Sequence, residues 1–214
     1  MSRVTLTFDN GPHPDITPAV LDVLRRHAVT AHFFVLGKNI GDAVGRGLVA
    51  RARDLGHRIG NHSFSHAIPL GQDPRTDAVE AEIVTTAALL APLVAGPKSF
   101  RPFGGGGVLG PHLLSKAAVD HLVANAYTCA LWSSVPHDWD DPDGWPARAI
   151  ADCTAQAHAV VVLHDVPGAC LAGLEHFLEV AAAQGVDFVA DLPRACTPIV
   201  DGEVVGDLAH LVAA

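Results

Sequence analysis

Short apolar runs alternate with longer amphipathic stretches along almost the whole chain. Seven β-type runs lie near 3–8, 31–36, 57–61, 98–102, 127–133, 159–164 and 186–190. Stretches with helical periodicity lie between them, at about 17–27, 40–55, 74–93, 111–124, 143–157 and 170–183. Repeated alternation of strand and helix predicts parallel strands with helices packed outside them. We therefore expect an α/β fold.

Two architectures fit this order, an open doubly wound sheet and a closed barrel. No G-x-G-x-x-G follows the first strand, which weakens the dinucleotide-binding version of the open sheet. The four glycines of 104–107 are not followed by the Lys-Ser or Lys-Thr of a phosphate-binding loop. Because no linker or low-complexity stretch interrupts the pattern, we expect residues 1–214 to form a single domain.

Composition and charge exclude several classes of partner. The formal net charge is −9, from 14 Lys and Arg against 23 Asp and Glu, and the cations are scattered, which argues against nucleic-acid binding. No apolar run approaches the roughly 20 residues of a membrane span, so we expect no membrane partner. The chain runs directly into the apolar segment 4–8, without a signal peptide, and a cytoplasmic location is expected. The sequence does not set the oligomeric state.

Polar residues that suit catalysis follow several of the predicted strands, on the side where α/β folds build their active sites. Asp9 and Asn10 follow the first strand and precede Gly-Pro; an acid there can abstract a proton, although Asp-Asn-Gly-Pro is also ordinary turn vocabulary. His62 and His66 follow the third strand, four residues apart, and can share a metal. In a chain with 13 histidines, such a pair also arises by chance.

Three further segments carry candidate chemistry. Arg101, beside a glycine loop, can hold a carboxylate while the glycine amides bind a developing oxyanion; the alternative is a surface Arg beside a flexible loop. Asp138 and Trp139 suit a sugar-facing wall, or else a capped loop with a packing Trp. His164 ends an apolar strand beside Asp165 and is a natural proton donor, although a lone His is more often structural.

Taken in order, these segments resemble the polysaccharide deacetylases of the nodulation-protein NodB type, carbohydrate esterase family four. The pattern of that family is TFDDGP, HSxxH or HTxxH, RxP, a DxxDW-like segment and LHD. The chain reads TFDNGP at 7–12, HSFSH at 62–66, RP at 101–102, DW at 138–139 and LHD at 163–165. The likeness spans about residues 3–190. It implies a distorted (β/α) barrel, often with about seven parallel strands.

The resemblance also implies a reaction, the attack of metal-activated water on an acetamide carbonyl. Asp9 would be the general base, held by Arg101. His164 would be the general acid that protonates the leaving amine, and Asp138 would orient or tune it. The implied substrate is an acetylated amino sugar or a related small amide.

A substrate pocket and a metal site follow from the same resemblance. Trp139 and Leu163 would line the acetyl pocket, and a backbone amide near Phe103 would stabilise the oxyanion. His62 and His66 would hold a divalent cation, Zn²⁺ being the first choice, because two imidazoles, one oxygen ligand and an open position suit it.

Two positions depart from the family pattern. Asn10 stands where the family has its third metal ligand, an Asp; an amide oxygen still coordinates but brings no charge, so weaker metal binding is expected. Asp9 could instead bind the metal itself, which would compromise it as a base. The third motif reads Arg-Pro-Phe-Gly where Arg-Pro-Pro-Tyr-Gly is common, so the position of the oxyanion donor is left open.

The sequence thus favours a metal-dependent N-deacetylase and leaves two alternatives. One keeps the fold and acts on a small formyl or acyl amide, which the lack of a leader supports, because wall polymers lie outside the cell. The other is a catalytically silent sugar-binding domain, motivated by Asn10. Metal content separates the silent domain from both enzymes.

Overall fold

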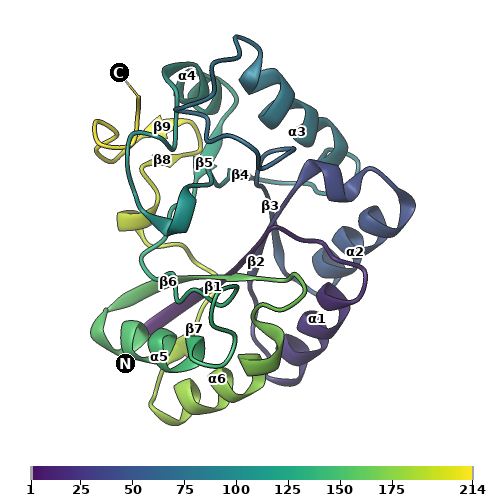
Figure 1. Ribbon diagram of the computed structural model, residues 1–214, viewed down its shortest axis with the longest axis vertical. Coiled ribbons are helices and arrows are strands. Elements are labelled where there is room, and N and C mark those ends of the chain that lie inside the picture. The colour runs from purple at the N-terminus through teal and green to yellow at the C-terminus, as the bar shows by residue number, and fades with distance from the viewer. Residues whose placement is uncertain (1, 214) are drawn as a thin grey trace.

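A computed structural model describes residues 2–213, which form one curved nine-stranded sheet with helices around its outside (Figure 1). The strands are β1 (Arg3–Asp9), β2 (His32–Val35), β3 (Arg58–Asn61), β4 (Lys98–Phe100), β5 (Tyr127–Cys129), β6 (His158–His164), β7 (Asp187–Phe188), β8 (Ile199–Val200) and β9 (Glu203–Val204). The helices are α1 (Ile16–Arg26), α2 (Ala43–Asp54), α3 (Thr85–Leu90), α4 (Lys116–Ala124), α5 (Trp145–Ala155) and α6 (Leu171–Ala183). The predicted α/β fold is confirmed.

Six parallel strands form the body of the sheet, in the order β6-β1-β2-β3-β4-β5. Beyond β5 the chain turns toward β6, where Ser134 makes a parallel bridge with Val161. The Ser134 amide also donates to the Val160 carbonyl at 3.0 Å. This contact joins the two ends of the parallel series, so the sheet curls into the distorted barrel that the family resemblance implies (Figure 1).

The seventh predicted strand is present, and a hairpin adds two more. β7 pairs in parallel with the first residues of β1, whereas β8 and β9 are antiparallel to each other and attach to β5. Asp201 and Gly202 form the hairpin turn with positive φ angles of 49° and 84°. Asp-Gly is a strong signal for a two-residue hairpin loop, but strands of two residues are too short to show periodicity.

The helix expected over 74–93 begins later in the structure. Helical structure starts at residues 78–79 and continues through the π-helical segment Glu80–Val84 into α3. Upstream, the Asp73 carboxylate accepts a hydrogen bond from the Arg75 amide at 3.0 Å. This local side-chain bond competes with helical bonding and makes a turn there.

Side chains alternate between the two faces of β6. Val161 and Leu163 belong to the core between the sheet and the outer helices, together with Phe8 and Phe177. Val160 and Val162 belong to a second cluster on the other face. This alternation follows from the two-residue period of a strand, and it decides which residues of β6 face the site.

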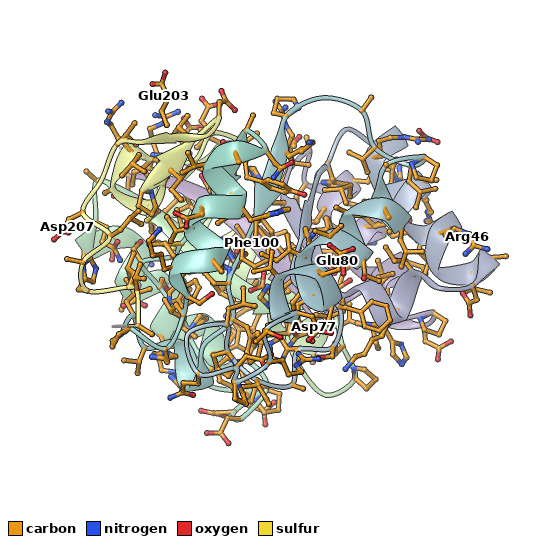
Figure 2. All side chains as sticks on the ribbon, turned by 90° about the horizontal axis from the view of Figure 1, so that it is seen from above. Arg46, Asp77, Glu80, Phe100, Glu203 and Asp207 are labelled. Atoms are coloured by element: carbon orange, nitrogen blue, oxygen red, sulfur yellow. The ribbon has the colours of Figure 1, made fainter. Side chains whose placement is uncertain are left out.

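The four cysteines, Cys129, Cys153, Cys170 and Cys196, are free and buried. Figure 2 shows Phe100, which is fully buried, near the middle of the molecule, with Arg46 and Glu203 at its edges. Within residues 2–213, no helix is long and apolar enough to cross a membrane.

Candidate active site

The polar residues that follow the strands converge on one cavity. Asp9 pairs with His164 in the register of β1 and β6, and Asn61 pairs with Phe100 in that of β3 and β4. Because these strands are parallel and in register, the next residues emerge at the same end of the barrel. A cavity of about 280 Å³ lies there, lined by seven of the ten predicted site residues: Asp9, Asn10, His62, His66, Phe103, Trp139 and His164.

Arg101 lies behind the cavity and holds Asp9 in place. Its guanidinium is fully buried and donates to the Asp9 carboxylate at 3.1 Å. It also donates to the Thr7 hydroxyl and to the carbonyls of Ala130 and Leu131. Burial lowers the pKa of Arg101 while Asp9 raises it. The predicted contact between Arg101 and Asp9 is therefore present, inside the barrel rather than on its surface.

The imidazole of His62 has a defined tautomer. Its Nδ1 lies 2.9 Å from the Arg101 carbonyl, which can only accept, so Nδ1 carries the proton. Nε2 then has a free lone pair, and it lies 3.6 Å from an Asp9 carboxylate oxygen. Burial lowers the pKa of His62, which keeps the ring neutral. Two acceptors therefore face each other, and the lone pair of His62 Nε2 is free to bind a metal ion.

His66 is placed by its backbone and by an aromatic neighbour. Its φ is +57°, a left-handed conformation, and its ring stacks on Phe103 with centroids 3.9 Å apart. The His62 and His66 rings lie 5.1 Å apart. Burial, and then the His62 ring, lower the pKa of His66 to about 3. Both imidazoles are thus neutral near pH 7, the form in which histidine binds metals.

Asn10 presents an amide oxygen without a partner. Its φ is +73°, its backbone carbonyl accepts from Asn39 at 2.8 Å, and its side-chain Oδ1 is buried with no hydrogen bond. A buried acceptor left unpaired is costly, and native structures keep few of them. The Oδ1 atom of Asn10 is therefore suited to receive a ligand.

This set of donors fits a divalent metal ion. Within the part of the chain that the structure describes, no three His, Cys, Asp or Glu side chains form a metal-binding group. The amide oxygen of Asn10 lines the same cavity as His62 and His66 and is available as a third ligand. Two imidazole nitrogens and one oxygen, facing an open cavity, match the ligand set of a catalytic zinc site.

The proton donor predicted at His164 is held by Asp138. Asp138 is fully buried; one carboxylate oxygen lies 2.8 Å from the His164 Nδ1 and the other accepts the His164 backbone amide at 2.8 Å. Nδ1 therefore donates to Asp138, and Nε2 is the ring nitrogen left for the cavity. Burial lowers the pKa of His164, but Asp138, together with the charges of Asp9 and Asp165, outweighs this effect, and the net shift is upward.

The aromatic wall of the cavity differs from the prediction at one position. Trp139 packs edge-on against His164, with centroids 4.7 Å apart, and lines the cavity as expected. Leu163 does not line it, because its side chain lies in the core on the opposite face of β6. Val162 takes that place. Strand alternation from His164 already indicates Val162, since residues two apart share a face.

Trp132 is a wall residue that sequence reasoning missed. It lines the cavity, and its indole Nε1 donates to the Gly107 carbonyl at 2.7 Å. The glycine loop 104–107 forms the neighbouring part of the wall, next to Phe103. Trp132 falls within the predicted strand 127–133, but nothing in that run distinguishes a cavity residue from a core residue.

Comparison with known proteins identifies the family. The model of the polysaccharide deacetylase family matches residues 1–108 of the chain. A chitooligosaccharide deacetylase from Rhizobium leguminosarum bv. phaseoli is 34% identical over 180 residues, which cover 81% of this chain and 73% of that protein. The chain belongs to the polysaccharide deacetylase family.

One similar protein is much longer than this chain, and one similar solved structure contains a cobalt ion. The peptidoglycan-N-acetylglucosamine deacetylase PgdA of Listeria monocytogenes is 33% identical over 190 residues, which are 87% of this chain but 37% of that protein. The chain thus spans little more than a third of that relative. A family 4 acetyl xylan esterase from Clostridium thermocellum, solved in complex with a cobalt ion, superposes with a TM-score of 0.66 at 27% identity over 87% of both chains.

Asp165 supports the first polysaccharide deacetylase motif, residues 7–12. This buried carboxyl accepts the Thr17 hydroxyl at 2.5 Å, and Thr17 Oγ1 accepts the His13 amide at 2.8 Å. A Cβ added at Gly11 would lie 2.2 Å from an Asp165 oxygen, so only glycine fits at position 11. Burial raises the pKa of Asp165 to about 7.

Proposed function

We propose that this chain is a metal-dependent N-deacetylase acting on N-acetylated amino-sugar oligosaccharides. The observation that supports this best is the pairing of two features in one cavity. The first feature is a pair of atoms with unpaired lone pairs, His62 Nε2 and Asn10 Oδ1. The second is His164, whose ring is hydrogen-bonded to the buried carboxylate of Asp138. The similar peptidoglycan-N-acetylglucosamine and chitooligosaccharide deacetylases support the substrate class.

His62, His66 and Asn10 would hold the metal ion. A divalent ion bound there supplies Lewis-acid polarisation of the acetyl carbonyl and lowers the pKa of water. The weaker part of this set is Asn10, because an amide adds no charge beside the dication. His62 is the most rigid ligand, since its Nδ1–H is fixed by the Arg101 carbonyl.

Asp9 and His164 would move the protons. Asp9 faces the cavity beside Arg101 and would accept a proton from the attacking water. His164 would hold a proton on Nε2 and deliver it to the amine nitrogen as the C–N bond breaks. Asp138 stabilises that protonated ring and fixes its direction. Trp139 and Val162 would contact the acetyl group and the sugar.

Asp138→Asn should change the pH profile of the enzyme. Asp138 raises the pKa of His164 against the opposing effect of burial, so an amide in its place should let that pKa fall. A general acid must be protonated, and the alkaline limb of kcat/KM should therefore move to lower pH. Profiles for the wild type and for Asp140→Asn, an exposed control, should coincide. If the alkaline limb of the kcat/KM profile stays in place in Asp138→Asn, His164 is not the general acid.

Asn10→Asp should tighten metal binding by at least about tenfold, the lower end of what changes around metal ligands cost. The new carboxylate places a negative charge where Oδ1 now lies unpaired. Zinc competition with a chelator measures the affinity of both proteins. Asn125→Asp, which adds the same charge on the exposed end of α4, should leave it unchanged. Equal affinities for wild type and Asn10→Asp would show that Asn10 is not a ligand.

A substrate panel tests the proposed reaction. Zinc-loaded protein is incubated with an N-acetylated chitooligosaccharide, with acetylated xylan and with a small N-formyl or N-acetyl amide, and released acetate or formate is measured. The proposal expects the chitooligosaccharide to react fastest. Faster release from the small amide would favour the acyl-amide alternative. Zinc binding without any release would favour a silent sugar-binding domain.

A further inference from the structure

The loop between the two imidazoles is fixed from behind by a buried glutamate. Glu82 comes from the π-helical segment Glu80–Val84 and is 2% exposed. One of its carboxylate oxygens accepts the backbone amides of Phe64 at 3.0 Å and Ser65 at 2.8 Å. The other accepts the Ser65 hydroxyl at 2.7 Å. Figure 2 labels Asp77 and Glu80, on the stretch that leads to this residue.

Arg75 supplies the remaining hydrogen bond to Glu82. Its guanidinium donates to Glu82 at 2.9 Å and to Asp73 at 2.6 Å. All four hydrogen bonds to the Glu82 carboxylate are thus made by protein groups. A charge buried to this extent needs such compensation, and the larger part of it comes from the loop.

The carbonyl side of the same loop is held independently. The amides of Gly37 and Lys38 donate to the carbonyls of Ser63 and Phe64 at 3.0 and 3.1 Å, and the Lys38 ammonium donates to the Ser65 carbonyl at 2.9 Å. The backbone between the imidazoles is therefore hydrogen-bonded through both its carbonyls and its amides. Glu82 accepts the hydrogen bonds from the amides of Phe64 and Ser65.

These hydrogen bonds hold the loop in an unfavourable backbone conformation. Ser63 and His66 both have positive φ angles, 70° and 57°, which non-glycine residues adopt at a cost when the surroundings enforce it. His62 has its ring fixed directly by the Arg101 carbonyl, whereas His66 is placed through this backbone and by stacking on Phe103. The direction of the His66 ring thus depends on the loop that Glu82 holds.

We propose that Glu82 is a positioning residue for the metal site, setting His66 relative to His62 and thereby the affinity for the metal. The inference rests on the proposed function, which requires that these two histidines bind a metal ion. On this inference, the Glu82 carboxylate contributes to metal binding and not only to the stability of the fold. The site has only a neutral amide as its oxygen ligand, so the fixed placement of the second imidazole carries more of the affinity.

Metal titration of the full chain tests this role. Glu82→Ala should raise the Kd for Zn²⁺ by about 10–100-fold, the range typical of groups that orient metal ligands. With Co²⁺ as the probe, its visible absorption bands should shift, because the direction of one ligand changes. Glu82→Gln keeps an acceptor oxygen for the Phe64 and Ser65 amides, so it should recover part of the affinity.

Two matched variants separate positioning from charge and from stability. Glu175→Ala removes an exposed carboxylate on α6 that pairs with Arg26, and should leave the Kd and the cobalt spectrum unchanged. Val49→Ala, a buried position in α2, should lower the melting temperature of the metal-free protein without changing the Kd.

The outcomes distinguish this inference from the proposed function. Wild-type Kd and an unchanged cobalt spectrum in both Glu82 variants would overturn the inference alone, and would make Glu82 a purely structural carboxylate. If Glu82→Ala does not fold, Glu82→Gln decides: a weaker Kd with altered cobalt bands supports positioning, and wild-type values refute it. Failure of the wild-type protein itself to bind Zn²⁺ or Co²⁺ would contradict the proposed function, and the inference with it.

Discussion

Replacing His164 with alanine is expected to lower kcat/KM for deacetylation by roughly 10²–10⁴-fold, the usual contribution of general acid–base assistance. The reason is its placement: the ring lines the same cavity as the two histidines that we propose as metal ligands, and Asp138 fixes its Nδ1 and raises its pKa. Without it, the amine would leave unprotonated. Because His164 is not among the proposed ligands, zinc content should stay at the wild-type level.

Acetate release and bound zinc, measured on the same preparations, check this result. His176→Ala removes an exposed imidazole from α6 and should keep full activity. A His164→Ala protein with near wild-type turnover would make His164 a structural residue. Loss of zinc together with activity would instead indicate that His164 supports the metal.

Arg101→Leu is expected to destabilise the fold by about 3–5 kcal/mol, the usual cost of breaking a buried ion pair from one side. The variant leaves the Asp9 carboxylate buried with its charge uncompensated, and it removes the donors to Thr7, Ala130 and Leu131. For a domain of this size, the melting temperature should fall by roughly 2–4 °C per kcal/mol. Chemical and thermal unfolding of the metal-free protein measure the loss.

Two companion variants show whether the ion pair is the cause. Arg101→Lys keeps the charge but not the planar fork, so its loss should be smaller. Adding Asp9→Leu to Arg101→Leu removes both charges and should recover part of the stability, because no unpaired carboxylate remains. A melting temperature for Arg101→Leu within a degree of wild type would contradict the role given to this pair.

The strand ends explain why so much of the site could be predicted from the sequence. Asp9, Asn61 and His164 close their strands, and parallel register brings whatever follows them to one end of the barrel. A polar residue directly after an apolar run is visible in the sequence. Its convergence with others then follows from the topology.

At Leu163 the family motif and the strand periodicity predict different positions for the side chain. The family's LHD segment suggested Leu163 as a wall of the pocket, yet its side chain lies in the helix-facing core. Val162 shares a face with His164 and lines the cavity instead. The two-residue period of the strand contained this information.

Glu82 and Trp132 could not have been found in the same way. Glu82 lies 18 residues after Phe64 and 17 after Ser65, and the turn near Asp73 lies between them. Trp132 looks like any apolar residue at the end of a strand. Long-range contacts of this kind depend on loop conformation, which has no simple periodic signature.

Thr17 illustrates a local expectation that tertiary contacts changed. The pair Thr17-Pro18 favours a helix start capped by the threonine, but α1 begins at Ile16. The Thr17 hydroxyl is directed instead to Asp165, at the end of β6. Its hydrogen bond thus ties the first motif to the last rather than capping the helix.

Acetate release that depends on metal occupancy is the most direct test of the central claim, that the cavity of His62, His66 and Asn10 binds a metal ion used in deacetylation. The protein is stripped with a chelator, titrated with Zn²⁺, and assayed on an N-acetylated chitooligosaccharide at each step, alongside His66→Ala. We expect no release from the stripped protein, a rise that saturates at one zinc per chain, and no rise in the variant. Full release from stripped protein, or a titration unaffected by His66→Ala, would contradict it.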